Sequence, residues 1–307
     1  MNIAKIALFV ILSAGGWVQL GCGGGGARTE KSADFEFPQR VGSLREADLT
    51  EASGLAASKC QPDVYWTHND SGNGAYLYAI DGAGTSLGVW HVTGATNRDW
   101  EDIAAFKDDA GKCFVLVGDI GNNELKKEQF AVYRIAEPTV DAPSKAKAGP
   151  SPRGTTPADV FDFRYPDTRR NAETLLVHPV SGEIYVLTKS KSDPVTVYKL
   201  KPDFSGANQT ADKIAEFTVP AVPNGLLTGG DISADGRHLV VCDYVYGYEL
   251  SLPALSTNFD DIWKQQPRRF DLGDRPVGEA VAFTRTGDAV LSVSEEANTP
   301  VFLVRRK

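Results

Sequence analysis

The 307-residue sequence has few histidines and cysteines, and it lacks the local patterns that mark common catalytic sites. Its four histidines have no spacing that matches a zinc site. There is no His-Glu-x-x-His segment, no nucleophile elbow between a strand and a helix, and no glycine-rich phosphate loop leading into a helix. These absences argue against the hydrolases and nucleotide-binding enzymes that such motifs define.

Sustained helical periodicity and excess positive charge are also missing. No stretch repeats apolar residues with the period of a helix, so an α/β sheet is not expected. The formal net charge is -8, and removing the single lysine of the predicted export signal makes it -9. An acidic chain argues against a nucleic-acid partner and against a basic membrane-binding surface.

The N-terminus has the layout of an export signal. Lys5 precedes the apolar run 6–13, and the glycine-containing segment 15–21 leads to Cys22. We predict that 1–21 is a signal peptide, because the run is too short for a membrane span of about 20 residues. Gly21 before Cys22 resembles a lipoprotein signal, although Gln19 replaces the usual leucine. Lipidated Cys22 in the bacterial cell envelope is therefore expected, on the periplasmic or extracellular face. Plain secretion with unmodified Cys22 is the alternative.

The segment 22–37 is rich in glycine and charge and is predicted to be a flexible tether. About 270 residues remain from Pro38 onward, enough for one large all-β domain. An exported protein can form disulfides. Cys60 and Cys113 lie in similar turn regions of successive units and are a possible pair, whereas Cys242 lies in an apolar strand and is expected to be a buried thiol.

Short β-rich segments separated by Gly, Asn and Asp recur in five units. The predicted strands are 53–57, 64–70 and 76–81; 101–106, 114–119, 130–135 and 160–165; 173–177, 184–188, 195–200 and 214–219; 231–233, 239–242, 247–250 and 268–272; and 279–283, 290–293 and 301–304. The segment 138–159, rich in Pro, Ala, Lys and Gly, is predicted to be a loop insertion.

The fifth unit shows three strands before the chain ends, and 41–44 can supply its fourth. Pairing the two ends closes a ring and removes exposed sheet edges. We therefore predict an all-β fold, a β-propeller of five four-stranded blades. A six-bladed ring is the alternative if 138–171 contains further strands.

The first strands of propeller blades line the central channel, so acidic residues near their starts are expected to converge at one mouth. Carboxylates repel one another unless a positive charge lies among them, and Ca²⁺ accepts oxygen ligands. The candidate metal ligands are Glu51, Glu101, Glu173, Asp231 and Glu279. Their register is loose, since Glu51 lies two residues early and Asp231 about three late.

The second strands are expected to end on the same face. The candidate ligand-binding residues there are His68, Asn69, Asp70, Trp100, Asp119, Asn122, Lys189, Asp243 and Glu295. Acidic residues at strand ends also stabilise turns or form hydrogen bonds between blades. This interpretation and a bound cation both remain open. Trp100 is expected to pack between blades more than to stack on a ligand.

Three segments together carry a resemblance: Trp66–Gly72, Asp99–Ala104 and Gly118–Asn123. They resemble a family of uncharacterised exported bacterial propellers, many of them lipoproteins, which implies a fold and a compartment without an activity. The predicted acidic ring is also similar in architecture to calcium-dependent apyrases, which implies that Glu101, Glu173 and Glu279 lie near a metal. Ser53 and Thr228 stand where acids would then be expected.

Two functions are compatible with this sequence. One is a non-catalytic, monomeric module that binds a protein or small molecule at the mouth and reaches the membrane through its lipid alone. The other is a Ca²⁺-dependent hydrolase of phosphoanhydrides, phosphate esters or lactones. A cation that only stiffens the ring is a third, purely structural reading.

Overall fold

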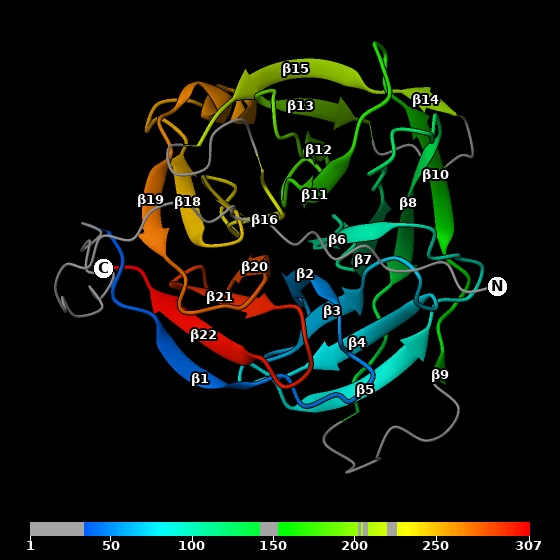
Figure 1. Cartoon of the computed structure of the whole chain (residues 1–307), viewed down its shortest axis with the longest axis vertical. Coiled ribbons are helices and arrows are strands. Elements are labelled where there is room, and N and C mark those ends of the chain that lie inside the picture. The colour runs from blue at the N-terminus through cyan, green and yellow to red at the C-terminus, as the bar shows by residue number, and fades with distance from the viewer. Residues whose placement is uncertain (1–33, 142–152, 202–203, 205–207, 220–225) are drawn as a thin grey trace, which may run out of the picture. The chain divides into compact units, whose positions relative to one another are not determined.

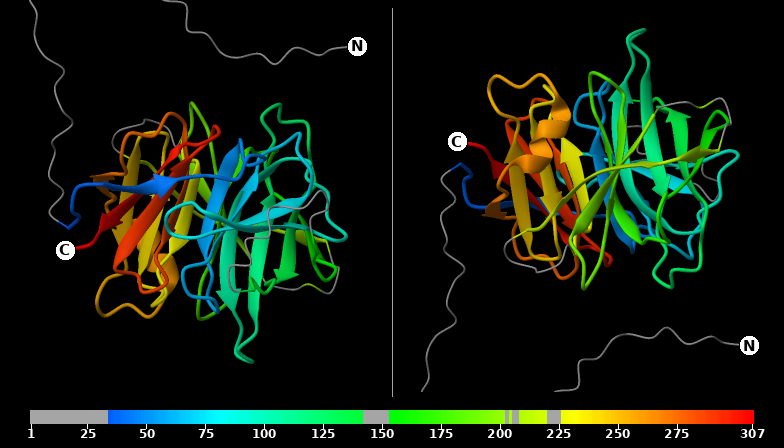
Figure 2. Two further views of the ribbon diagram at one scale, coloured as in Figure 1. Left: turned by 90° about the horizontal axis from the view of Figure 1, so that it is seen from below. Right: turned by 90° about the horizontal axis from the view of Figure 1, so that it is seen from above.

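Five small β-sheets form a ring in the computed structural model, and this arrangement is a five-bladed β-propeller (Figure 1). The structure describes residues 34–141, 153–201, 204, 208–219 and 226–307. The predicted signal peptide, Cys22, all of the tether except 34–37, and 142–152 of the predicted insertion lie outside these residues. Figure 2 shows from two sides that the strands run between the two faces of the ring.

The first two blades each contain four antiparallel strands and a fifth, two-residue strand that pairs in parallel at the outer edge. Blade 1 consists of β2 (Ala52–Ala57), β3 (Tyr65–Asn69), β4 (Tyr76–Ile80), β5 (Ser86–His91) and β9 (Arg153–Gly154). Blade 2 consists of β6 (Trp100–Lys107), β7 (Cys113–Asp119), β8 (Phe130–Ala136), β10 (Asp159–Arg164) and β14 (Gln209–Thr210). β5, β9 and β14 were not predicted from the sequence. In β5, Gly88 and partly exposed side chains weaken the apolar alternation.

The other three blades each contain four strands. Blade 3 consists of β11 (Ala172–Val177), β12 (Ile184–Thr188), β13 (Val195–Leu200) and β15 (Asp212–Phe217). Blade 4 consists of β16 (Gly229–Ile232), β17 (His238–Cys242), β18 (Tyr246–Ser251) and β19 (Arg268–Asp271). Blade 5 consists of β20 (Gly278–Phe283), β21 (Ala289–Ser294), β22 (Pro300–Arg305) and β1 (Gln39–Ser43). The six-bladed alternative is wrong, because five sheets close the ring and the described residues of 138–171 add strands to blades 1 and 2 only.

The N-terminal strand closes the ring, as predicted. β1 pairs antiparallel with β22, with Gln39 opposite Leu303 and Ser43 opposite Pro300. Ordered contacts begin before Pro38, because Phe35 bridges to Arg306 and stacks on Phe270 with ring centroids 3.9 Å apart. Residues 39–43 and the C-terminal strand are therefore held in one sheet, and Phe35 packs against the neighbouring blade 4.

The hydrophobic core is divided among the interfaces between blades. The buried side chains form five clusters, and each is shared by two neighbouring blades. Between blades 1 and 2, for example, Trp66 and Trp90 pack with Trp100 and Tyr133. The sole helix among the described residues is a 3-10 turn, Phe259–Lys264, which adds Trp263 to the cluster between blades 3 and 4. No described segment is a helix of the length and apolarity that crossing a bilayer requires.

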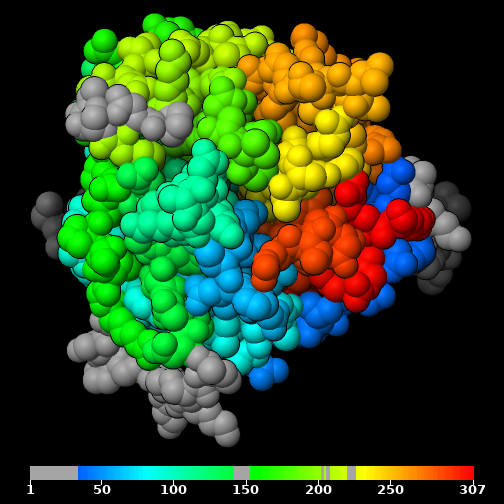
Figure 3. Space-filling model, turned by 180° about the vertical axis from the view of Figure 1, so that it is seen from behind, coloured from blue at the N-terminus to red at the C-terminus, as the bar shows by residue number. Residues whose placement is uncertain are grey.

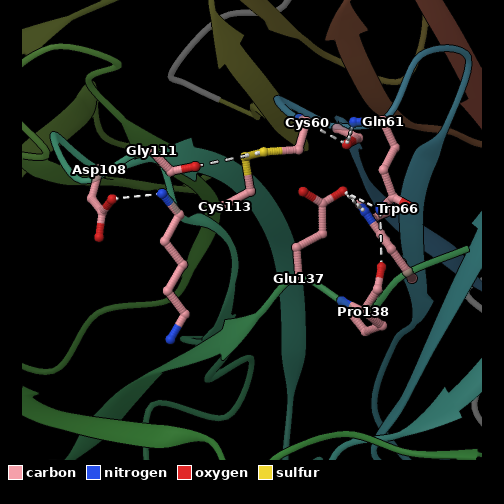
Figure 4. Close-up of a disulfide and its surroundings, with 10 residues drawn as sticks. Cys60, Gln61, Trp66, Asp108, Gly111, Cys113, Glu137 and Pro138 are labelled. Atoms are coloured by element: carbon pink, nitrogen blue, oxygen red, sulfur yellow. Dashed lines mark hydrogen bonds between the residues drawn. A yellow bond between two sulfur atoms is a disulfide. The ribbon is translucent and has the colours of Figure 1, made fainter.

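A disulfide joins blade 1 to blade 2. Cys60, in the loop after β2, is bonded to Cys113 at the start of β7, and Glu137 nearby accepts hydrogen bonds from Gln61 and Trp66 (Figure 4). The cysteines are 53 residues apart. In the chain-entropy model, a loop of that length makes the bond stabilising by about 4 kcal/mol. Cys242 is buried and free, as expected.

If Phe35 helps to close the ring, replacing it should destabilise the protein far more than replacing nearby Phe37. Phe35 is 3 % exposed and Phe37 is 50 % exposed. We expect Phe35→Ala to lower the free energy of unfolding by about 3–5 kcal/mol, the usual cost of deleting a buried aromatic ring. Phe37→Ala is the matched control and should change it by less than about 0.5 kcal/mol. Equal effects in chemical denaturation would contradict the role of Phe35 in closing the ring.

Candidate functional site

Three of the candidate acids reach the channel mouth because a β-bulge turns each of them inward. In β6, β11 and β20 the pairing with the second strand skips one residue near the start, and the skipped residues are Glu101, Glu173 and Glu279. A bulge redirects a side chain at the end of a strand. All three residues are buried, with 4–7 % of their surface exposed.

Hydroxyl residues occupy the same place in the other two blades. Ser53 is the skipped residue of β2, and its hydroxyl donates to the main-chain oxygen of Glu101 at 2.6 Å. Thr228, directly before β16, donates to the main-chain oxygen of Gly278 at 3.1 Å. Both bonds join one blade to the next, so these positions are used for assembly of the ring.

The remaining two candidate metal ligands, Glu51 and Asp231, do not lie level with the three bulged glutamates along the inner strands. Glu51 is on the rim, where Asn73 donates to it at 2.5 Å. Asp231 is farther along its strand, and its carboxylate accepts N–H bonds from Ile232 at 2.8 Å and from Phe283 at 2.9 Å. Asp102, which sequence analysis did not single out, does the same with Ile103 and Leu175. Inside the ring, these two aspartates therefore hold inner strands together across blade boundaries.

Three of the candidates for ligand binding support turns. Asn69 accepts from the N–H groups of Thr50 and Glu51, and Asn122 accepts from those of Lys126 and Lys127. Asp243 accepts from two N–H groups of its own turn. These residues shape the loops around the mouth.

Asp119 does not take the place of Asp70. It pairs opposite Trp100 as Asn69 pairs opposite Ala52, so it is one residue out of step. A shift of one residue sends a strand side chain to the other face. Asp119 accordingly bonds Arg98 at 2.7 Å and is 0 % exposed.

Trp100 and His68 are buried inside the propeller. Their rings meet edge to face with centroids 5.7 Å apart, and both residues are 0 % exposed. Burial lowers the pKa of His68 to about 4, so the imidazole is neutral at pH 7. Its Nδ1 lies 3.0 Å from the carbonyl oxygen of Asn69, which can only accept, so Nδ1 carries the proton. Neither ring contacts a ligand at the mouth without rearrangement.

Lys189 supplies positive charge to the centre of the mouth. Its ammonium is bonded to the Glu173 carboxylate and lies 4.8 Å from the centroid of the Tyr244 ring. Burial lowers the pKa of Lys189, but Glu173 and Glu279 outweigh burial and raise it above its usual value. The lysine therefore stays charged and offsets part of the repulsion among the acids.

Protonation offsets another part of that repulsion. Burial, followed by nearby Glu173, raises the pKa of Glu101 well above its usual range, and burial does the same for Glu279. Burial together with Asp70 and Glu51 raises the pKa of Glu295 to about 7. Burial raises the pKa of Asp70 to about 6, with a further contribution from Asp99. The mouth thus has carboxyl groups that titrate near neutral pH.

Asp70, Asp99 and Glu101 form a close acidic group at the mouth, with carboxylate oxygens within 4.8 Å of one another. Lys127 donates to Asp99 at 2.9 Å and to the carbonyl oxygen of Gly121 at 3.0 Å. These oxygens suit a hard cation such as Ca²⁺. Glu173 and Glu279 face Lys189 instead, as its raised pKa reflects.

A hollow of about 350 Å³ lies beside Lys189. Its lining includes Asn123, Leu125, Arg169, Arg170, Lys189 and Lys191. Figure 3 views the molecule from behind, where differently coloured segments, from blue through green and yellow to red, meet around the middle. Of this set only Lys189 was a candidate from the sequence. Asn123 ends the segment Gly118–Asn123, and the other residues come from loops without a motif.

No protein-family model matches this chain, and a comparison with curated proteins returns no match. The resemblances to exported propellers and to apyrases therefore stay predictions. The segment Gly84–Gly88 matches the pattern Gly-x-Ser-x-Gly, which marks a nucleophile elbow only where a strand precedes it and a helix follows it. It lies at the β4–β5 hairpin, without a following helix, and Ser86 donates to Glu46 at 2.6 Å. It is not a nucleophile elbow.

The raised pKa of Glu295 implies that part of the protein's stability is lost as the pH rises toward neutral. The folded-state pKa of about 7 lies above the ordinary value of 4.5, so the folded protein binds this proton more tightly than the unfolded chain. Its contribution to stability is therefore present below about pH 4.5 and is lost as the pH rises through about 7. We expect Glu295→Gln to lose less stability than the wild type between those two pH values. Glu296→Gln, the exposed neighbour, is the control, and identical pH profiles for all three proteins in thermal melting would contradict this.

Proposed function

We propose that this chain is an exported, lipid-anchored β-propeller that binds a small molecule at the channel mouth without converting it. The observation that carries the proposal is the hollow of about 350 Å³ beside Lys189. That size falls in the range of small-molecule sites. The amide, ammonium and guanidinium groups in its lining are hydrogen-bond donors, which favour an oxygen-rich ligand such as a sugar or an organic acid.

The absence of an activated nucleophile among the described residues supports binding without catalysis. Two Ser–His contacts occur there, both with the serine hydroxyl 3.1 Å from imidazole Nδ1. In the first, His178 Nδ1 also accepts the main-chain N–H of Ser181, an ordinary turn bond. In the second, His238 lies 3.1 Å from the guanidinium of Arg306. Neither histidine lines the hollow.

Carboxyl groups that titrate near neutral pH favour the second candidate, a Ca²⁺-dependent hydrolase of phosphoanhydrides, phosphate esters or lactones. Glu295, with a pKa of about 7, and Asp70, with a pKa of about 6, are suited to acid and base steps at pH 7. This candidate requires turnover that depends on both the cation and Glu295.

A paired substitution tests the hollow. The chain is titrated with sugars, organic acids, phosphate esters and lactones, with binding followed by calorimetry and turnover by product analysis. Asn123 lines the hollow and Glu124 does not, so Asn123→Trp should weaken binding by at least about tenfold, while Glu124→Trp leaves it unchanged. Equal effects of the two variants, or no binding to any compound, would contradict the proposal. Turnover lost in Glu295→Gln would favour the hydrolase.

Cys22→Ser tests the lipid anchor. If Cys22 is acylated, the wild-type chain fractionates with membranes and incorporates labelled fatty acid in a bacterial host. The variant should lose the label and move to the soluble fraction, because the acyl chains supply the hydrophobic contact with the bilayer. An unlabelled wild-type chain in the soluble fraction would contradict lipidation of Cys22 and favour secretion without a lipid anchor.

A further inference from the structure

Asp70, Asp99 and Glu101 place three carboxyl groups close together beside one bonded ammonium. They come from three places: Asp70 follows β3, Asp99 precedes β6, and Glu101 is the bulged residue of β6. Their oxygens lie within 4.8 Å of one another. When all three are ionised, the single ammonium bonded to the group, that of Lys127 on Asp99, leaves two negative charges.

Glu101 provides an independent sign that a partner belongs in this group. Its residue is 4 % exposed, and within the described part of the chain its Oε1 atom is buried without a hydrogen-bond partner. A buried carboxylate oxygen without a partner is costly. Oε1 lies on the side of Asp99, because a Cβ atom built on Gly121 would meet both this oxygen and Asp99 Oδ2, so Oε1 points into the group.

Gly121 keeps space open next to the same oxygen. A Cβ atom built on Gly121 would lie 2.0 Å from Glu101 Oε1 and 2.8 Å from Asp99 Oδ2. No side chain is compatible with those distances, so the position requires glycine while the carboxylates stay in place. The carbonyl oxygen of Gly121 accepts from Lys127 at 3.0 Å, which adds a main-chain oxygen beside the carboxylates.

We infer that Asp70, Asp99 and Glu101 bind one Ca²⁺ ion between blades 1 and 2. Ca²⁺ takes carboxylate and carbonyl oxygens and tolerates irregular geometry. The group offers neither histidine nor cysteine, which disfavours zinc. The site differs from the five-acid axial ring expected from the sequence, because Glu173 is bonded to Lys189.

Lys127 competes with the ion in this arrangement. Its ammonium is bonded to both Asp99 and the Gly121 carbonyl, two oxygens that the ion would share. Binding of Ca²⁺ therefore exchanges a lysine contact for an ion contact at Asp99. Lys126, the preceding residue, pairs on the surface with Glu124 and makes no contact with the group.

The test titrates the full chain, purified in detergent, with Ca²⁺ by calorimetry and with Tb³⁺ by indole-sensitised luminescence. We expect saturable one-to-one binding, and Ca²⁺ should displace Tb³⁺. Glu101→Gln should weaken Ca²⁺ binding by at least about tenfold, because it removes a ligand charge. Asp99→Asn, at a less buried position, should do the same and serves if Glu101→Gln fails to fold.

The lysine pair gives the sharper comparison. Lys127→Ala should tighten Ca²⁺ binding by about tenfold, because it removes both the competing cation and its repulsion. Lys126→Ala removes an equal charge from the same loop and should leave the affinity unchanged. Absence of binding, wild-type affinity in the Glu101 and Asp99 variants, or equal effects of the two lysine variants would each overturn the inference. The probe is the metal alone, so this result is independent of whether the hollow binds a ligand.

Discussion

Closure of the ring by β1 and β22 is the constraint on which the rest of the structure depends. It forces five inner strands to surround one axis, so their channel-facing groups need partners within a few ångströms. Asp102 and Asp231 meet part of that need by accepting main-chain N–H groups from neighbouring blades, and Ser53 and Thr228 donate to main-chain oxygens. A buried polar network of this kind stabilises only when its members are bonded.

The same convergence concentrates carboxylates at the mouth, where the structure limits their repulsion in three ways. Lys189 places an ammonium against Glu173. Burial raises the pKa of the Glu279 and Glu295 carboxyl groups, which favours their neutral forms. Ser53 and Thr228 replace acids in two of the five blades. Around Glu101, three carboxyl groups lie beside one bonded ammonium, that of Lys127 on Asp99.

One loop connects the two candidate sites. The turn after β7 is anchored by Asn122, which bonds the N–H groups of Lys126 and Lys127 and the carbonyl oxygen of Arg170. This loop brings Gly121 and Lys127 to the acidic group and Asn123 and Leu125 to the lining of the hollow. A change in the contacts of Lys127 would therefore occur in a segment that also shapes the hollow.

The sequence by itself determined the five-unit repeat, nearly all the longer strands and closure by the N-terminal segment, because alternation and turn residues are local signals. It also drew attention to Glu101, Lys189 and Glu295. Only the tertiary structure decided which acidic side chains lie level with one another along the channel. A bulge consumes one residue and reverses which side chains face the channel, and strand pairing, not local sequence, places that bulge. Asp119 lies one residue away from the position that counting along the chain assigned it, and Asp231 lies farther along its strand than the three bulged glutamates. Asp70 of blade 1 meets Asp99 and Glu101 of blade 2 only when these two blades pack together.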